Sequence, residues 1–173
     1  MRAVVPLLEL ELEVQLATDE VPVPDEARFE KWARDTLLAA DTGGECAMVI
    51  RLVGMAEGAR LNETWRHKGG ATNVLAFPPP GGRAVGPDAQ TELGDVVICL
   101  PIAMEEAKEQ RKEFQAHLAH LIVHGTLHLL GYTHEGEEDA ARMESLETSV
   151  LRGLGIADPY DAGNSGEASR IDA

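Results

Sequence analysis

The stretch HGTLHLLGYTH, residues 124–134, constrains the fold more than any other part of the sequence. His124 and His128 are four residues apart in a run with helical spacing, so their imidazoles share one face of a helix. Gly131 allows the chain to leave the helix sharply, and His134 follows three residues later. The pattern therefore predicts a helix that ends in a tight bend, with three imidazoles converging on one point.

Three converging imidazoles indicate a transition-metal site. Neutral histidines are good ligands for Zn²⁺, and three protein ligands leave a fourth position open for water, as in catalytic zinc sites. Cys46 and Cys99 lie in distant apolar runs and are expected to be buried thiols in a reducing compartment. The sequence predicts one Zn²⁺ per chain, held by His124, His128 and His134, although such a site also accepts other divalent ions.

The spacing matches the zinc-protease signature H-E-x-x-H-x-x-G-x-x-H except at its second position, where this chain has Gly125. The missing glutamate is the general base of those proteases, so its absence argues against peptide hydrolysis. A metal-bound water remains a usable nucleophile near neutral pH. A phosphodiester fits such a site, because an arginine can hold the charge that accumulates on its non-bridging oxygens.

The rest of the chain has the periodicity of an α+β domain. Residues 8–16 alternate between apolar and polar side chains, which is typical of a half-buried strand. Strands are predicted at residues 8–16, 45–53, 73–77 and 94–100, and helices at 26–40, 57–68, 101–130 (in one or two pieces) and 137–155. This order predicts a small mixed sheet of about four strands with helices packed against it. Residues 1–156 are expected to form one domain, followed by a disordered polar tail at 157–173.

Three segments resemble the YbeY family of bacterial rRNA maturation factors. They are LNETWRHKGGATNVLAFP (61–78), LGDVVICLP (93–101) and AHLIVHGTLHLLGYTH (119–134), with MESLE (143–147) behind the last. Members of that family are metal-dependent endoribonucleases that act on single-stranded RNA. They are implicated in processing the 3′ end of 16S rRNA and in ribosome quality control. The resemblance thus implies rRNA and the small ribosomal subunit as partners.

By position, the resemblance assigns the metal ligands to the three histidines and RNA cleavage to Arg66. Lys68 and His120 are candidate substrate-binding residues. His120 and the nearby His117 are interpreted as hydrogen-bond partners behind the site or residues lining a cleft, or as ordinary polar positions at a helix edge. One departure is Thr133, where the family usually has an aspartate before the last histidine. A hydroxyl orients that imidazole more weakly than a carboxylate does.

The charge of the chain leaves other functions open. Asp and Glu number 30 against 15 Lys and Arg, giving a net charge of −15, whereas RNA binding normally needs a local basic patch. A zinc hydrolase of another substrate class, including a metalloprotease-like enzyme, is one alternative. A metal-stabilised ribosome-binding factor without catalysis is another. The sequence has neither a signal peptide nor a membrane-spanning run, so a soluble cytoplasmic protein is expected.

Overall fold

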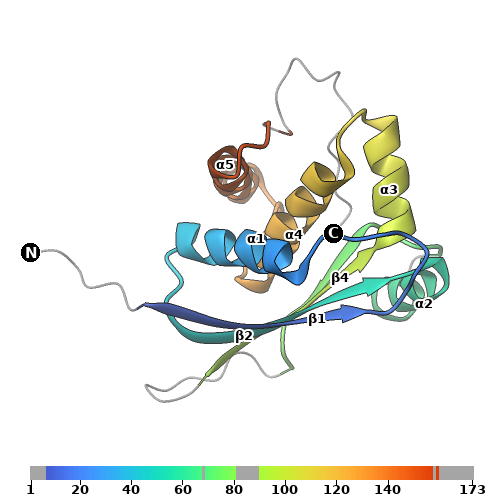
Figure 1. The fold of residues 1–173 in the computed structure, drawn as a ribbon. Helices are drawn as coiled ribbons and strands as arrows, with labels where there is room; N and C mark the ends of the chain where they lie inside the picture. Colours follow the sequence, from blue (N-terminus) through green and yellow to red (C-terminus); the bar gives the residue numbers. More distant parts are fainter. Residues whose placement is uncertain (1–6, 68, 81–89, 158, 160–173) are drawn as a thin grey trace, which may run out of the picture.

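The computed structural model describes residues 7–67, 69–80, 90–157 and 159 (Figure 1). Its elements are β1 (Leu8–Leu16), α1 (Glu26–Ala39), β2 (Gly44–Val53), α2 (Met55–Arg66), β3 (Val74–Phe77), β4 (Thr91–Cys99), α3 (Leu100–Glu109), α4 (Phe114–Leu129) and α5 (Glu137–Gly153). The α+β prediction is confirmed, and each predicted strand and helix is present with its ends shifted by a few residues. Pro159 is buried although it lies within the predicted tail, most of which is outside the described residues.

The sheet is mixed, as predicted, with the strand order β1-β2-β4-β3. The first three strands in this order are parallel, and β3 pairs with β4 antiparallel at the edge. Between Ala47 and Met48 of β2 the register with β4 shifts, which leaves one extra residue on β4 just before Gly94. Such a bulge bends a strand locally, and glycine is well suited to it.

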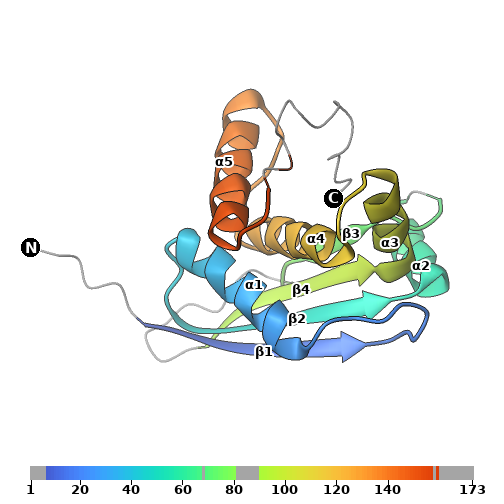
Figure 2. The same cartoon turned by 45° about the horizontal axis from the view of Figure 1, so that its top comes forward.

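Helices lie on both faces of this sheet. Neighbouring residues of a strand point to opposite faces, and Val96 of β4 belongs to the large core cluster that α1, α4 and α5 help to form. Val97 belongs instead to a smaller cluster against which Leu61 of α2 packs. Helix α2 therefore packs on the face opposite α4, while α1, α4 and α5 lie above the other face (Figure 2).

Helix α4 is the central helix of the larger layer. It contacts the sheet on one side and α1, α3 and α5 on the others. A Cβ at Gly125 would lie 2.7 Å from Cγ1 of Val96 and 3.3 Å from Cγ2 of Val74. The helix can approach β3 and β4 this closely only because position 125 has no side chain. The absence of the protease glutamate at position 125 thus has a structural reason, because the sheet occupies the space that its side chain would need.

Candidate metal centre

The three histidines of the sequence motif converge in the structure. Helix α4 places His124 and His128 one turn apart, with their Nε2 atoms 3.0 Å from each other. The chain leaves the helix at Gly131, whose φ of +99° favours glycine, and returns with His134. One nitrogen from each ring can be chosen so that all three lie within 4.8 Å of one another. The predicted helix, bend and convergence are therefore all present.

This histidine cluster fits a tetrahedral metal ion. Two nitrogens bound to one zinc ion at about 2.0–2.1 Å would be separated by about 3.3 Å, close to the separation of the first pair. Within the part of the chain that the structure describes, no fourth His, Cys, Asp or Glu joins the group. His124 is buried, His128 is half-buried and His134 is exposed. The cluster is therefore open to solvent on the His134 side, as a catalytic site requires.

The buried carboxylate of Glu147, on α5, fixes the orientation of His124. Its Oε1 lies 2.7 Å from Nδ1 of His124, and its Oε2 lies 2.9 Å from Nε2 of His120. A carboxylate only accepts hydrogen bonds, so both imidazoles donate to it. A neutral His124 then has its lone pair on Nε2, the atom that faces His128. This arrangement, in which a carboxylate holds a metal-binding histidine, is usual in metal sites.

The protonation states in this group are favourable for metal binding. Burial would raise the pKa of Glu147, but hydrogen bonds from His120 and His124 outweigh it and lower that pKa to about 2. Burial, followed by the charges of His124 and His134, lowers the pKa of His128 to about 4. His128 is therefore unprotonated at neutral pH, and a proton does not compete with a metal for it.

Sequence reasoning did not find the role of Glu147. Its signal is nonetheless present in the sequence, because Glu147 lies four residues after Met143 and three before Val150 on one face of α5. Both neighbours are buried, as is Glu147 itself, which has 0% of its surface exposed. An acidic residue on an apolar helix stripe indicates a buried partner. The partner could not be identified without the tertiary structure.

The two upstream histidines of α4 are both buried, rather than lying at an exposed helix edge. His117 Nε2 lies 3.0 Å from Oε1 of Glu106, a residue of α3. His120 is 2% exposed and is bonded to Glu147. Direct contact between His120 and substrate stays a prediction.

Arg66, the predicted cleavage residue, comes from another helix. It is the last residue of α2, on the opposite face of the sheet from α4, and it is half-buried. The next residue, His67, has the left-handed conformation that ends the helix. Lys68 lies outside the described residues. The structure thus brings together the three predicted metal ligands, whereas the role of Arg66 beside them stays a prediction.

Several known proteins with similar sequences are described as Endoribonuclease YbeY. The family described as Endoribonuclease YbeY matches residues 13–155. The Endoribonuclease YbeY of Pseudomonas syringae pv. tomato is 49% identical over 87% of this chain and 88% of its own length. Those of Alkalilimnicola ehrlichii and Nitrosococcus oceani are 48% and 44% identical, over 90% of this chain and 92% and 99% of their own lengths. The solution structure of TM1509 from Thermotoga maritima shares the fold, with a TM-score of 0.53 and 22% identity, over 92% of this chain and 100% of its own.

Proposed function

Because the chain belongs to the endoribonuclease YbeY family, we propose that it is a metal-dependent endoribonuclease that cleaves single-stranded RNA. Its role would be the late maturation of the 3′ end of 16S rRNA, together with ribosome quality control. The match over residues 13–155 supports the endoribonuclease activity. The single observation that supports metal dependence is the cluster of His124, His128 and His134 inside that span.

The metal in this proposal is one Zn²⁺ per chain, held by the three histidines. When bound, zinc would supply a water that is a good nucleophile near neutral pH. Glu147 keeps Nε2 of His124 directed at the cluster. His120, which is buried against Glu147, is proposed to act mainly by holding that carboxylate in place.

RNA is favoured over peptide as the substrate because of position 125. The sheet fills the space beside Gly125, so α4 has no general base there. Phosphodiester cleavage can instead be accelerated by a positively charged group placed beside the non-bridging oxygens, which carry the negative charge of the transition state. We propose Arg66 for this role, since its planar guanidinium can hold two such oxygens. Lys68, two residues later, is the proposed second contact with the RNA backbone.

The small ribosomal subunit is the proposed partner, and the cytoplasm the proposed location. Family membership is the support for both. In the portion of the chain that the structure describes, no helix is sufficiently long and apolar to cross a bilayer.

The proposal is tested with variants of Arg66. The zinc content of each variant is the control, because Arg66 is not a proposed metal ligand. Single-turnover cleavage of an unstructured RNA is measured for wild type, Arg66→Lys and Arg66→Ala, with zinc quantified in each sample. Loss of one contact made mainly in the transition state slows cleavage roughly a hundredfold or more. Arg66→Lys is expected to be impaired too, because it loses the planar fork. Near-wild-type cleavage by the alanine variant would overturn the role of Arg66.

A further inference from the structure

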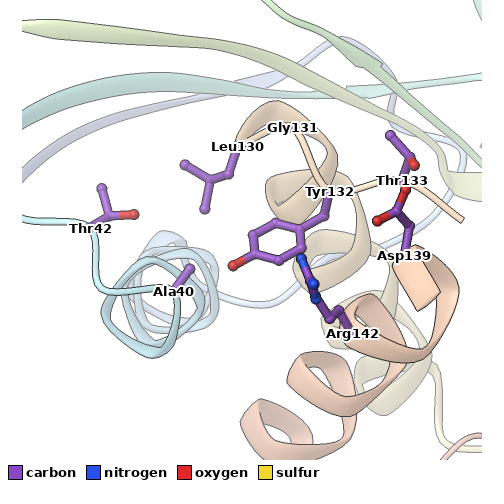
Figure 3. Close-up of a pocket in the computed structure, with 8 residues that line it drawn as sticks. All are labelled: Ala40, Thr42, Leu130, Gly131, Tyr132, Thr133, Asp139 and Arg142. Carbon is purple, nitrogen blue, oxygen red and sulfur yellow. The ribbon is translucent and has the colours of Figure 1, made fainter.

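A cavity of about 460 Å³ lies beside the bend that carries His134 (Figure 3). It is lined by the end of α1 and the turn after it, by the bend, and by the first turns of α5: Ala40, Thr42, Leu130, Gly131, Tyr132, Thr133, Asp139 and Arg142. Three of these, Gly131 to Thr133, connect the second candidate metal ligand to the third. The cavity and the histidine cluster therefore share one segment of chain.

Arg142 is the cationic side chain of this cavity. It is exposed, and among the described residues it forms no ion pair or hydrogen bond, although the chain carries 30 acidic side chains. Figure 3 shows its guanidinium directed toward Tyr132, while the carboxylate of Asp139 is directed toward Thr133. Because this guanidinium forms no ion pair with a described carboxylate, not even with Asp139 of the same cavity, it is available to an anionic ligand.

Tyr132 supplies the aromatic surface. Its ring is half-buried, packs against the large core cluster and points into the cavity (Figure 3). A ring held by packing on one side is a pre-organised surface on which a nucleobase can stack. An aromatic ring beside an unpaired arginine offers one contact for a base and one for a phosphate. The cavity volume falls within the range of about 300–1,000 Å³ that small-molecule sites have.

We propose that this cavity binds one nucleotide of the single-stranded RNA, with its base on Tyr132 and its phosphate on Arg142. The nucleotide lies next to the one whose phosphate is cut, because the bend places the cavity beside the histidine cluster. Asp139 and Thr133 provide hydrogen-bond acceptors for the edge of the base. This inference rests on the proposed endoribonuclease function and assigns part of its substrate site.

The test measures RNA binding and the cleavage step separately. Single-turnover cleavage at increasing enzyme concentration gives a half-saturating concentration and a maximal rate constant. Arg142→Gln is expected to raise the half-saturating concentration roughly tenfold, since a charge-assisted contact is lost. Tyr132→Leu is expected to raise it roughly five- to hundredfold, the range for loss of one stacked base. The metal content and the melting temperature of Arg142→Gln should stay at wild-type values, so that the change is one of RNA binding and not of metal or fold.

Arg152→Gln is the matched control, because it removes the same charge from the exposed C-terminal turn of the same helix. It should leave the half-saturating concentration unchanged. An unchanged value in Arg142→Gln, or an equal change in Arg152→Gln, would overturn the proposal.

A second arm uses adenosine 5′-monophosphate, which contains no bond that an endoribonuclease cuts. Its binding to wild type and to Arg142→Gln is followed by NMR, so the site is tested even if wild type proves not to cleave RNA. Weaker binding to the variant and competition with RNA support the proposal. Binding that depends on Arg142 without competition would assign the cavity to a free nucleotide and overturn the RNA site.

Discussion

At the scale of single residues, one buried carboxylate orients the candidate metal site. Glu147 accepts hydrogen bonds from His120 and His124 at once, and its pKa of about 2 means that it is ionised at neutral pH. The three candidate ligand histidines could be predicted from sequence, because their spacing places His124 and His128 on one helix face and Gly131 allows the chain to return with His134. Glu147 could not be assigned, because its partners are 23 and 27 residues away in sequence.

We predict that Glu147→Gln weakens zinc binding about 10- to 100-fold, the usual effect of losing a group that orients a ligand histidine. A glutamine has one acceptor oxygen, so it cannot accept from both imidazoles as the carboxylate does. Zinc affinity is measured by competition with a chromophoric chelator. Glu144→Gln, at an exposed position of the same helix, is the control. Wild-type affinity in the Glu147 variant would contradict the assigned role.

A second prediction concerns pH and His128. In the metal-free protein the pKa of His128 is lowered to about 4, whereas an unfolded histidine titrates near about 6.5. The unfolded chain therefore binds more protons between these values, so stability falls as pH falls from about 6.5 to about 4. Urea unfolding of metal-free protein at several pH values in this window is expected to show that loss. His128→Gln should flatten the dependence, and an identical slope in both proteins would show that His128 does not cause it.

At the scale of elements, periodicity predicted what each segment is, but not how closely the segments approach. The strand predicted at residues 94–100 is Thr91–Cys99 in the structure, so it begins three residues before Gly94. In the structure Gly94 is a strand residue with a φ of +114°, and a Cβ there would overlap the backbone oxygen of Phe77. The face on which α2 packs was likewise not predictable, since an amphipathic helix fits either face of a sheet.

Substitutions at Gly125 test how closely α4 approaches the sheet. Gly125→Ala should gain about 1 kcal/mol of helix propensity and lose about 1–3 kcal/mol from overpacking against Val96, for a net loss of up to about 2 kcal/mol. Gly125→Glu, which restores the protease signature, should lose more than about 3 kcal/mol and gain no peptidase activity, because it buries an unpaired charge. The free energy of unfolding of each variant is measured with urea.

Gly153→Ala is the control for this series, since nothing lies within 4 Å of a Cβ at that helical position. It should be no less stable than wild type, with a gain in the free energy of unfolding of up to about 1 kcal/mol from helix propensity alone. A Gly125→Ala protein more stable than wild type would show that α4 can move away from the sheet.

At the scale of the whole molecule, the net charge of −15 opposes binding of RNA at long range. Specific cations must therefore act at short range, and we assign contacts with the RNA backbone to Arg66, Lys68 and Arg142. Arg66 is the last residue of α2 and Arg142 lies on α5, whereas the histidine cluster is formed by α4 and the bend after it. Composition alone argued against an RNA-binding protein, because it averages over a surface on which only a few positions contact substrate.

The central claim is that the histidine cluster makes this chain a metal-dependent endoribonuclease, and metal reconstitution tests it most directly. The purified protein is stripped with a chelator and titrated with Zn²⁺ while cleavage of a single-stranded RNA is followed. We predict that cleavage is lost on stripping, returns in proportion to zinc and levels off at one ion per chain. His128→Ala, treated in the same way, should stay inactive and bind no stoichiometric zinc. Cleavage that persists in the stripped protein, or that returns fully in His128→Ala, would contradict the account.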